Sequence, residues 1–282
     1  MPELLRIATV QFAETYDPRH NAAVIRRYMQ KAVQQGADVV HFHEAALTGY
    51  LTQDDAPALE QINWEAVRQA GREICQEAAR LGVWVALGSS HPLTPPHKPT
   101  NCLYLIGPDG TVRDRYDKRF CTESDLRVYT PGDHFVTFEL KGWTCGLLIC
   151  FDLRFPELYR RLYRQGVRVV FQSFHNARYD GPGVHGKIMR QTLQADAAHN
   201  GMWISAPNSS ARYSRWPSVF ITPDGVIAGQ LRQNRAGMMM NEANGDQEFY
   251  DPMKRFRDDV LAGKLHTGEP VEDPRLDDRA SL

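Results

Sequence analysis

The chain has 282 residues, of which 42% are hydrophobic and 24% charged, a composition typical of one large globular domain or two small ones. Its 33 basic and 34 acidic residues give a formal net charge of −1, which disfavours nucleic acid or an anionic membrane as a bulk partner. No apolar run approaches the roughly 18 residues of a membrane span, so we expect no membrane-embedded segment.

The predicted elements alternate strands and helices along the chain. The first segment, LLRIATVQFA (4–13), is predicted to be a strand that starts the fold, not a signal peptide. Helical spacing of apolar residues predicts four helices, at 21–36, 63–82, 155–166 and 185–201. Further strands are predicted where residues are β-branched, aromatic or continuously apolar, at 37–45, 83–90, 101–107, 135–140, 144–150, 167–174, 201–208, 218–223 and 237–243.

Two predicted hairpin turns share one pattern. Pro-Asp-Gly lies between apolar runs at 106–112 and again at 221–227, about half a chain apart. This near-repeat indicates two similar halves, and the mixture of β-α alternation with hairpins predicts an α/β fold with mixed sheets and helices outside. No linker rich in Gly, Ser or Pro splits the chain, so we expect one domain over 1–282, with a charged surface tail from about residue 265.

The cysteines indicate the cellular compartment. Their number is odd and no pair has C-x-x-C spacing, which argues against a disulfide framework and against a zinc ribbon. We therefore expect reduced thiols in a cytoplasmic protein, most of them small buried hydrophobes. The five are Cys75, Cys102, Cys121, Cys145 and Cys150.

Cys150 lies at a corner between a predicted strand and a predicted helix, in GLLICFDLRFPELYR (146–160). A nucleophile at such a corner is exposed at the carboxyl edge of the sheet, and the backbone N–H that follows it can face a developing oxyanion. The nearby helix N-terminus is expected to lower the pKa of the thiol. The alternative is an ordinary buried cysteine, so the assignment depends on other residues.

Two charged residues upstream supply that context. Glu44 follows an apolar strand directly, where a carboxylate is out of place unless it is paired or catalytic. Lys118 follows the first Pro-Asp-Gly hairpin, and taken alone it would be an ordinary surface lysine. A general base, a fixed cation and a thiol are the groups that attack on an amide requires.

These three segments, in this order, resemble the nitrilase superfamily of carbon–nitrogen hydrolases. Glu44 precedes TGY (48–50), Lys118 lies in YDK (116–118), and CFDLRFPE (150–157) is nearly the full nucleophile motif of that family. The resemblance runs from the first strand to about residue 265. It implies a four-layer α-β-β-α sandwich with two pseudo-symmetric halves, a homodimer or higher homo-oligomer, a small-molecule substrate, and no metal or organic cofactor.

The resemblance also implies roles for the site residues. Glu44 takes the proton of Cys150 and later activates water, while Cys150 attacks a carbonyl or nitrile carbon and forms a thioester or thioimidate. Lys118 and the backbone N–H of Phe151 hold the developing negative charge. The expected reaction is hydrolysis of a small amide, N-carbamoyl compound or nitrile, and which of these is the substrate stays open.

The sequence departs from the family pattern at two places. His43 stands where the family often has proline before its first glutamate, and we expect little effect. The second glutamate of the family falls at Asp125 when counted back from Pro131-Gly132, and Glu123 is two residues away. Spacing favours Asp125 as the residue that assists Lys118, with Glu123 as the alternative.

Several other side chains invite different interpretations. His41 and His43 share one face of a strand and resemble half a zinc site, but no third ligand is evident. His175 and Asn176 end a predicted strand, where they are expected to line the substrate pocket. A Cys150–His175 dyad of the thiol-protease type is the mechanistic rival. Candidates for binding a carboxylate or a ring are Arg178, Tyr179, Arg212 and Trp216.

Two alternatives to hydrolysis are open at this point. The same thioester can be captured by an amine or alcohol, which would make the protein an acyltransferase; the lack of membrane spans argues against one that modifies lipids. A non-catalytic homologue kept for binding or assembly is the other alternative, and the presence of Glu44, Lys118 and Cys150 together argues against it.

Overall fold

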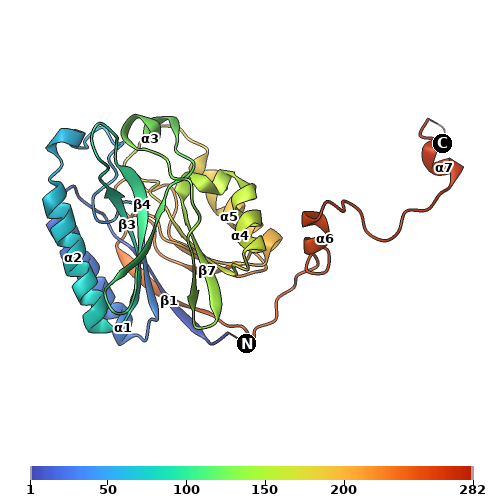
Figure 1. Ribbon diagram of the computed structural model, residues 1–282, viewed down its shortest axis with the longest axis horizontal. Helices are drawn as coiled ribbons and strands as arrows, with labels where there is room; N and C mark the ends of the chain where they lie inside the picture. The colour runs from blue at the N-terminus through green and yellow to red at the C-terminus, as the bar shows by residue number, and fades with distance from the viewer. Residues whose placement is uncertain (1, 281–282) are drawn as a thin grey trace. The chain divides into compact units, whose positions relative to one another are not determined.

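The computed structural model describes residues 2–280. Two six-stranded sheets form the centre of the unit that ends at Tyr250, and helices cover their outer faces (Figure 1). The first sheet has the order β12-β1-β2-β3-β4-β5 and the second has the order β11-β10-β9-β8-β7-β6. This is the α/β fold with mixed sheets that the sequence pattern predicts, in the four-layer sandwich that the family resemblance implies.

The two sheets repeat one pattern of strand directions. In the first sheet β1, β2 and β3 are parallel and are followed by antiparallel β4 and β5, while β12 pairs antiparallel with β1. In the second sheet β7, β8 and β9 are parallel and are followed by antiparallel β10 and β11, while β6 pairs antiparallel with β7. The predicted pseudo-symmetric halves are therefore confirmed at the level of strand order.

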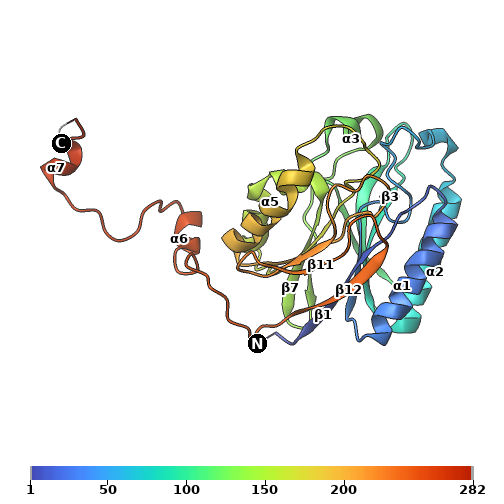
Figure 2. The ribbon, with the colours of Figure 1, turned by 180° about the vertical axis from the view of Figure 1, so that it is seen from behind.

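The strands of the first sheet are β1 (Leu5–Gln11), β2 (Val39–Phe42), β3 (Trp84–His91), β4 (Thr100–Ile106), β5 (Val112–Asp117) and β12 (Gly237–Ala243). Those of the second sheet are β6 (Thr137–Leu140), β7 (Trp143–Ile149), β8 (Val169–Ser173), β9 (Trp203–Ala206), β10 (Val219–Ile221) and β11 (Ile227–Gln230). Figure 2 shows β12 beside β1, its antiparallel partner from the other end of the sequence.

Helices lie on the outside of each sheet. On the first sheet these are α1 (Pro18–Gln34) and α2 (Trp64–Leu81), and on the second α4 (Pro156–Arg164) and α5 (His185–Asn200). Asp17 and Asn63 cap the N-termini of α1 and α2 by accepting backbone N–H groups, which the starts of helices leave unpaired. Shorter elements are α3 (Glu123–Val128), the 3₁₀ turns η1 (Leu59–Gln61) and η2 (Cys150–Arg154), α6 (Arg257–Leu261) and α7 (Pro274–Asp277).

The hydrophobic core has separate layers. Apolar side chains of α1 and α2 pack on the outer face of the first sheet, and Ile25 and Met29 of α1 are fully buried there. A larger cluster fills the second sheet and its helices and reaches across to the first sheet through Leu5 and Ile7. Burial on this scale is the main favourable contribution to the free energy of folding.

Two predicted elements have boundaries that differ from the prediction, a strand at its end and a helix at its start. The strand predicted at 37–45 stops at Phe42 because the chain turns at the next residues, and Ala45 has a φ of +56°. The helix predicted from 155 is preceded by η2, which begins at Cys150 itself. Both differences place polar residues at the edge of a sheet, where they can point into a pocket.

The remainder of the chain, from Asp251, forms a second unit that contains α6 and α7. The sequence predicts only a charged tail in this part of the chain, beginning at about residue 265. Within the described residues, none of the helices combines the length and apolar character needed to cross a membrane.

Asp196 in α5 predicts a pH-dependent cost to stability. It is buried, and its Oδ2 has no hydrogen-bond partner within residues 2–280. Burial raises the pKa of this carboxyl to about 7, although the charge of Arg160 opposes the shift. The folded state therefore holds the proton more tightly than the unfolded chain, so ionisation destabilises the fold as the pH rises above about 4, and fully above about 7.

We expect Asp196→Asn to raise the free energy of unfolding at pH 8.5 by about 2–4 kcal/mol, and this gain to shrink toward pH 4. Urea denaturation at both pH values measures the change. The exposed Asp133 provides the matched control, because its replacement by asparagine should change the free energy of unfolding little. A gain at Asp196 that is the same at both pH values would contradict the prediction.

Candidate active site

Cys150 is held at a strained corner. It follows β7, begins η2 and has a φ of +41°, a left-handed conformation that is costly for a residue with a side chain. The buried carboxylate of Asp152 holds this corner by accepting the N–H groups of Ile149 and Phe120, each at 2.9 Å, and the hydroxyl of Tyr116 at 2.8 Å. The half-buried thiol therefore projects from a fixed backbone.

Glu44 is fully buried at the end of β2 and all of its carboxylate contacts are defined. Its Oε1 accepts the Nζ of Lys118 at 2.9 Å and the Nδ2 of Asn101 at 2.7 Å. Its Oε2 accepts the backbone N–H of His175 at 2.8 Å. Gly88 of β3 lets the turn of Glu44 pack closely, because a Cβ at Gly88 would lie 2.0 Å from the His43 carbonyl oxygen.

Lys118 joins two carboxylates. Its Nζ lies 2.9 Å from Glu44 and 2.9 Å from Asp125, and all three side chains are buried. Burial alone would lower the pKa of Lys118, but the negative charges around it, with Glu44 first, raise that pKa well above its usual value. Lys118 is therefore a permanent cation in the site.

Asp125 rather than Glu123 contacts this lysine. Burial alone would raise the pKa of Asp125. The charge of Lys118 and a hydrogen bond from the Tyr50 hydroxyl at 2.5 Å have a larger effect in the opposite direction, so the pKa is lowered. Asp125 also accepts the Thr122 N–H in the capping box that starts α3, a helix that the sequence did not predict. Glu123 points to solvent, with its side chain 93% exposed beside Arg127.

The pKa of Cys150 is the opposite of what the sequence predicts. Burial and the charge of Glu44 raise it well above the usual value of a thiol, and the opposing charge of Lys118 does not offset them. The lowering predicted from the helix N-terminus is wrong, because burial of the thiol, with the charge of Glu44 second, shifts its pKa upward. The Cys150 side chain is therefore a neutral thiol at rest, and it would need a base to act as a nucleophile.

His175 is held by a second buried carboxylate. Its Nε2 lies 2.9 Å from Oε1 of Glu14, which also accepts the Nε of Arg178 at 3.0 Å. Burial raises the pKa of Glu14, but the charges and hydrogen bonds of His175, His43 and Ser209 lower it far below its usual range. Within residues 2–280, no hydrogen bond joins the His175 ring to the Cys150 sulfur, so the dyad interpretation loses its geometric basis.

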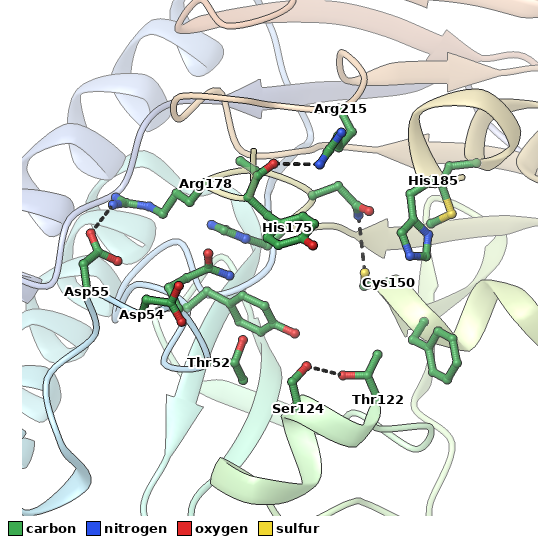
Figure 3. Close-up of a pocket in the computed structure, with 17 residues that line it drawn as sticks. Thr52, Asp54, Asp55, Thr122, Ser124, Cys150, His175, Arg178, His185 and Arg215 are labelled. Atoms are coloured by element: carbon green, nitrogen blue, oxygen red, sulfur yellow. Dashed lines mark hydrogen bonds and ion pairs between the residues drawn. The ribbon is translucent and has the colours of Figure 1, made fainter. Parts of the chain in front are cut away.

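These residues open on a pocket of about 540 Å³ (Figure 3). Cys150, Phe151, His175 and Asn176 all line it, and the Nδ2 of Asn176 donates to the Cys150 Sγ at 3.5 Å. The sequence predicts His175 and Asn176 as residues that line the pocket. Glu44, Lys118 and Asp125 are buried beside this site and are not among the residues that line the pocket.

The histidine pair at 41 and 43 has other partners. Both ring nitrogens of His41 lie 2.9 Å from serine hydroxyls, those of Ser205 and Ser173. The Nδ1 of His43 lies 3.0 Å from the Glu44 carbonyl oxygen. Within residues 2–280, no cluster of three His, Cys, Asp or Glu residues has the geometry of a metal site.

Sequence reasoning missed Glu14 and Asn101. Glu14 follows β1 as Glu44 follows β2, so the signal that selected Glu44, a carboxylate directly after an apolar strand, was present for Glu14 too. Asn101 carries no local signal, because an asparagine in a strand is common and only the approach of β4 to Glu44 gives it a partner.

The geometry can be compared with that of known proteins. The sequence profile of the carbon–nitrogen hydrolase family matches residues 6–246. The chain belongs to the carbon–nitrogen hydrolase family. It is accordingly a hydrolase of carbon–nitrogen bonds, as its motifs predict.

This hydrolase is similar to curated and solved relatives. It is 28% identical to the deaminated glutathione amidase of Yersinia enterocolitica, over 73% of this chain and 74% of that protein. It is 24% identical to the omega-amidase NIT2 of Homo sapiens, over 82% and 86% of the two chains. An amidase from Nesterenkonia sp. AN1, solved with butyramide, has a TM-score of 0.76 at 23% identity, covering 93% and 97%, a likeness of fold.

Proposed function

We propose that this hydrolase cleaves a small amide through a thioester on Cys150, with Glu44 as general base and Lys118 as the fixed cation. The observation that carries the proposal is the buried contact of Lys118 with Glu44 at 2.9 Å, beside a neutral thiol at the edge of the pocket. The relatives named above are amidases by name. The Nesterenkonia enzyme, a fold relative, has been solved with acetamide from fluoroacetamide attached to its active-site cysteine.

The first half of the reaction forms the acyl-enzyme. Glu44 takes the proton of the Cys150 thiol as the sulfur attacks the carbonyl carbon, so the thiolate exists only during attack. Negative charge moves to the carbonyl oxygen, where Lys118 and the backbone N–H of Phe151 stabilise it. Each such donor contributes about 3–4 kcal/mol to lowering the barrier. The proton then passes from Glu44 to the leaving nitrogen, and ammonia or an amine departs.

The second half releases the acid. Glu44 takes a proton from water, which attacks the thioester carbon, and the sulfur leaves as the thiol when the proton returns to it. The contacts of Glu44 with Asn101, Lys118 and the His175 N–H keep the carboxylate in one place for both halves. Such preorganisation lets one group serve as base and acid in turn.

Asp125 is proposed to position Lys118. We expect Asp125→Ala to lower kcat by roughly 10²-fold, because Lys118 loses one of its two carboxylate partners and shifts from the oxyanion. Glu123→Ala is the matched control, since Glu123 is exposed and two residues away, and it should stay within about twofold of wild type. Ammonia release measures both, and loss of activity only in Glu123→Ala would reverse the assignment.

A substrate panel tests the function directly. Purified enzyme is incubated with short aliphatic amides, N-carbamoyl amino acids and nitriles, and ammonia release is scored. We expect amides to be cleaved. Added hydroxylamine separates hydrolysis from acyl transfer: a hydroxamate formed at the expense of the acid at low hydroxylamine would favour the acyltransferase alternative.

Alkylation separates an enzyme from a non-catalytic homologue. Both Cys150 and Cys121 have raised pKa values, that of Cys121 about 12, chiefly because of burial. Only Cys150 is proposed to have a base beside it, so iodoacetamide should modify Cys150 first. Faster reaction at Cys121 would point to a binding protein.

Compartment and assembly belong to the same proposal. The five cysteines are unpaired, which supports a reducing cytoplasm. A homodimer or higher homo-oligomer is proposed from the family resemblance. Light scattering on the protein as it elutes from a size-exclusion column measures the mass of the assembly.

A further inference from the structure

A second cavity lies between α2 and the strands β3, β4 and β5 of the first sheet, with a volume of about 340 Å³. Among the described residues, it shares none of its lining with the pocket of Cys150, and the proposed chemistry does not use it. We call this cavity the α2 pocket. Its lining includes Val67, Gly71 and Cys75 of α2 and Leu87, Tyr104 and Ile106 of the sheet.

The sheet side of the α2 pocket presents apolar side chains because alternate residues of a strand share one face. Leu87 of β3 pairs with Tyr104 of β4, and Ile106 lies two residues farther along the same face. Val112 of β5 is the partner of Ile106 and also lines the pocket. Val112 is 51% exposed, so the pocket leaves apolar surface in contact with water. A ligand that covers this surface with apolar groups of its own gains free energy.

The hydroxyl groups in the walls of the α2 pocket already have partners in the protein. The Tyr104 hydroxyl lies 2.6 Å from Nδ1 of His91, and the Ser90 hydroxyl lies 3.1 Å from that of Thr48. The Ser89 hydroxyl donates to the carbonyl oxygen of Ser90 at 3.3 Å. A polar group that is already hydrogen-bonded gains little from a polar ligand. The interior of the α2 pocket therefore favours an apolar ligand.

Gly71 keeps the helix side of the pocket open. It lies inside α2, where glycine is among the least favourable residues. Its backbone is helical, so no special conformation requires glycine there. Crowding does not require it either, because a Cβ built at Gly71 would approach no other segment of the described chain within 4 Å. The missing side chain thus weakens the helix but leaves space that a larger residue would fill.

Two arginines of α2 give the mouth of the pocket a positive charge. Arg68 and Arg72 both line it, and their side chains are 57% and 54% exposed. Both form ion pairs with Glu65, at 2.7 and 2.8 Å. Within residues 2–280, neither has a second carboxylate partner, so the three side chains together carry one positive charge in excess. An anionic group bound here stays partly in water, which avoids the cost of burying a charge.

We propose that the α2 pocket binds the anion of a medium-chain fatty acid. The alkyl chain lies against Leu87, Ile106 and Val112 and takes the space beside Gly71. The carboxylate lies at the mouth, where it balances the excess charge of Arg68 and Arg72. This site is separate from the one that the proposed amidase function needs, so a failure of either proposal leaves the other standing.

Chain length and head group test the site in the wild-type protein. Calorimetric titration compares octanoate first with hexanoate and then with octylammonium. Octanoate should bind about 5- to 15-fold more tightly than hexanoate, because it buries two more methylene groups. Octylammonium should bind at least about threefold more weakly than octanoate, because the excess charge at the mouth is positive.

Filling the cavity provides a second test. Gly71→Leu places a side chain in the open space and should weaken octanoate binding by at least about tenfold. Gln76→Leu is the matched control, because it adds the same side chain at an exposed position of α2 that does not line the pocket, and it should bind octanoate as wild type does. Arg68→Gln combined with Arg72→Gln should weaken octanoate binding by about 3- to 10-fold and leave octanol binding unchanged.

Cysteine labelling locates the ligand without a variant, which covers the case in which Gly71→Leu does not fold. Cys75 lines the α2 pocket, Cys150 lines the other pocket, and Cys121 is in neither lining among the described residues. At about ten times its Kd, octanoate should slow N-ethylmaleimide labelling of Cys75 by about tenfold and leave Cys121 unchanged. Protection of Cys150 alone, equal affinity for hexanoate and octanoate, or wild-type binding in Gly71→Leu would overturn the site.

Discussion

Cys150→Ala is expected to abolish amide hydrolysis while the protein stays folded. The variant removes the atom that is proposed to form the thioester, and deleting a covalent nucleophile lowers kcat by roughly 10⁴-fold or more. The strained backbone at φ +41° is held by Asp152 and its three donors, and none of these three hydrogen bonds uses the Cys150 side chain. Ammonia release and urea denaturation together separate loss of chemistry from loss of fold.

Cys75→Ala is the matched control for this result. Cys75 is also an unpaired, half-buried cysteine, but it lies in α2 and does not line the pocket of Cys150. Its replacement should leave kcat within about twofold of wild type. Cys150→Ser should fail like Cys150→Ala, because a hydroxyl is less acidic than the already weakly acidic thiol. Turnover at the wild-type rate in Cys150→Ala would disprove the thioester mechanism.

Lys118→Met is expected to damage both stability and activity. The ammonium contacts Glu44 and Asp125 in a buried site, so its removal leaves two carboxylates without their shared cation. Breaking a buried ion pair from one side costs about 3–5 kcal/mol. Activity should fall by roughly 10²- to 10³-fold or more, since a proposed oxyanion donor is lost as well. Urea denaturation and ammonia release measure the two effects.

A second substitution distinguishes charge repulsion from loss of packing. Asp125→Asn added to Lys118→Met removes one of the two negative charges, so it should recover part of the lost stability without recovering activity. The loss in Lys118→Met should also be larger at pH 8 than at pH 5, because the uncompensated carboxylates can be protonated at lower pH. Lys31→Met, at an exposed position in α1, is the control and should change neither property. Equal losses at both pH values would contradict this explanation.

Much of the fold and part of the site follow from the sequence for identifiable reasons. The paired Pro-Asp-Gly turns predict two similar halves because a turn type leaves a local signature, and the two sheets share one strand order. Counting from Pro131-Gly132 selects Asp125 over Glu123, and Asp125 is the one that contacts Lys118. These inferences use neighbours along the chain, which the sequence shows directly.

The remaining features depend on segments that meet only in the folded chain. The raised pKa of Cys150 comes from burial beside Glu44, more than a hundred residues upstream, whereas the local motif suggested the opposite shift. The sequence suggests Arg178 as a ligand for a carboxylate, yet its guanidinium is paired with Glu14 and Asp55, which come from distant parts of the chain. Whether this arginine can meet a ligand is a property of tertiary packing.

One contact of the proposed base escapes side-chain mutagenesis. The Oε2 of Glu44 is held by the main-chain N–H of His175, which every residue except proline provides. Alanine scanning at position 175 would therefore report only on the imidazole and its link to Glu14, and would leave this anchor intact. Replacing the amide by an ester in a semisynthetic chain removes the N–H alone and exposes its contribution. Any residue other than proline at position 175 therefore keeps this anchor of the proposed base.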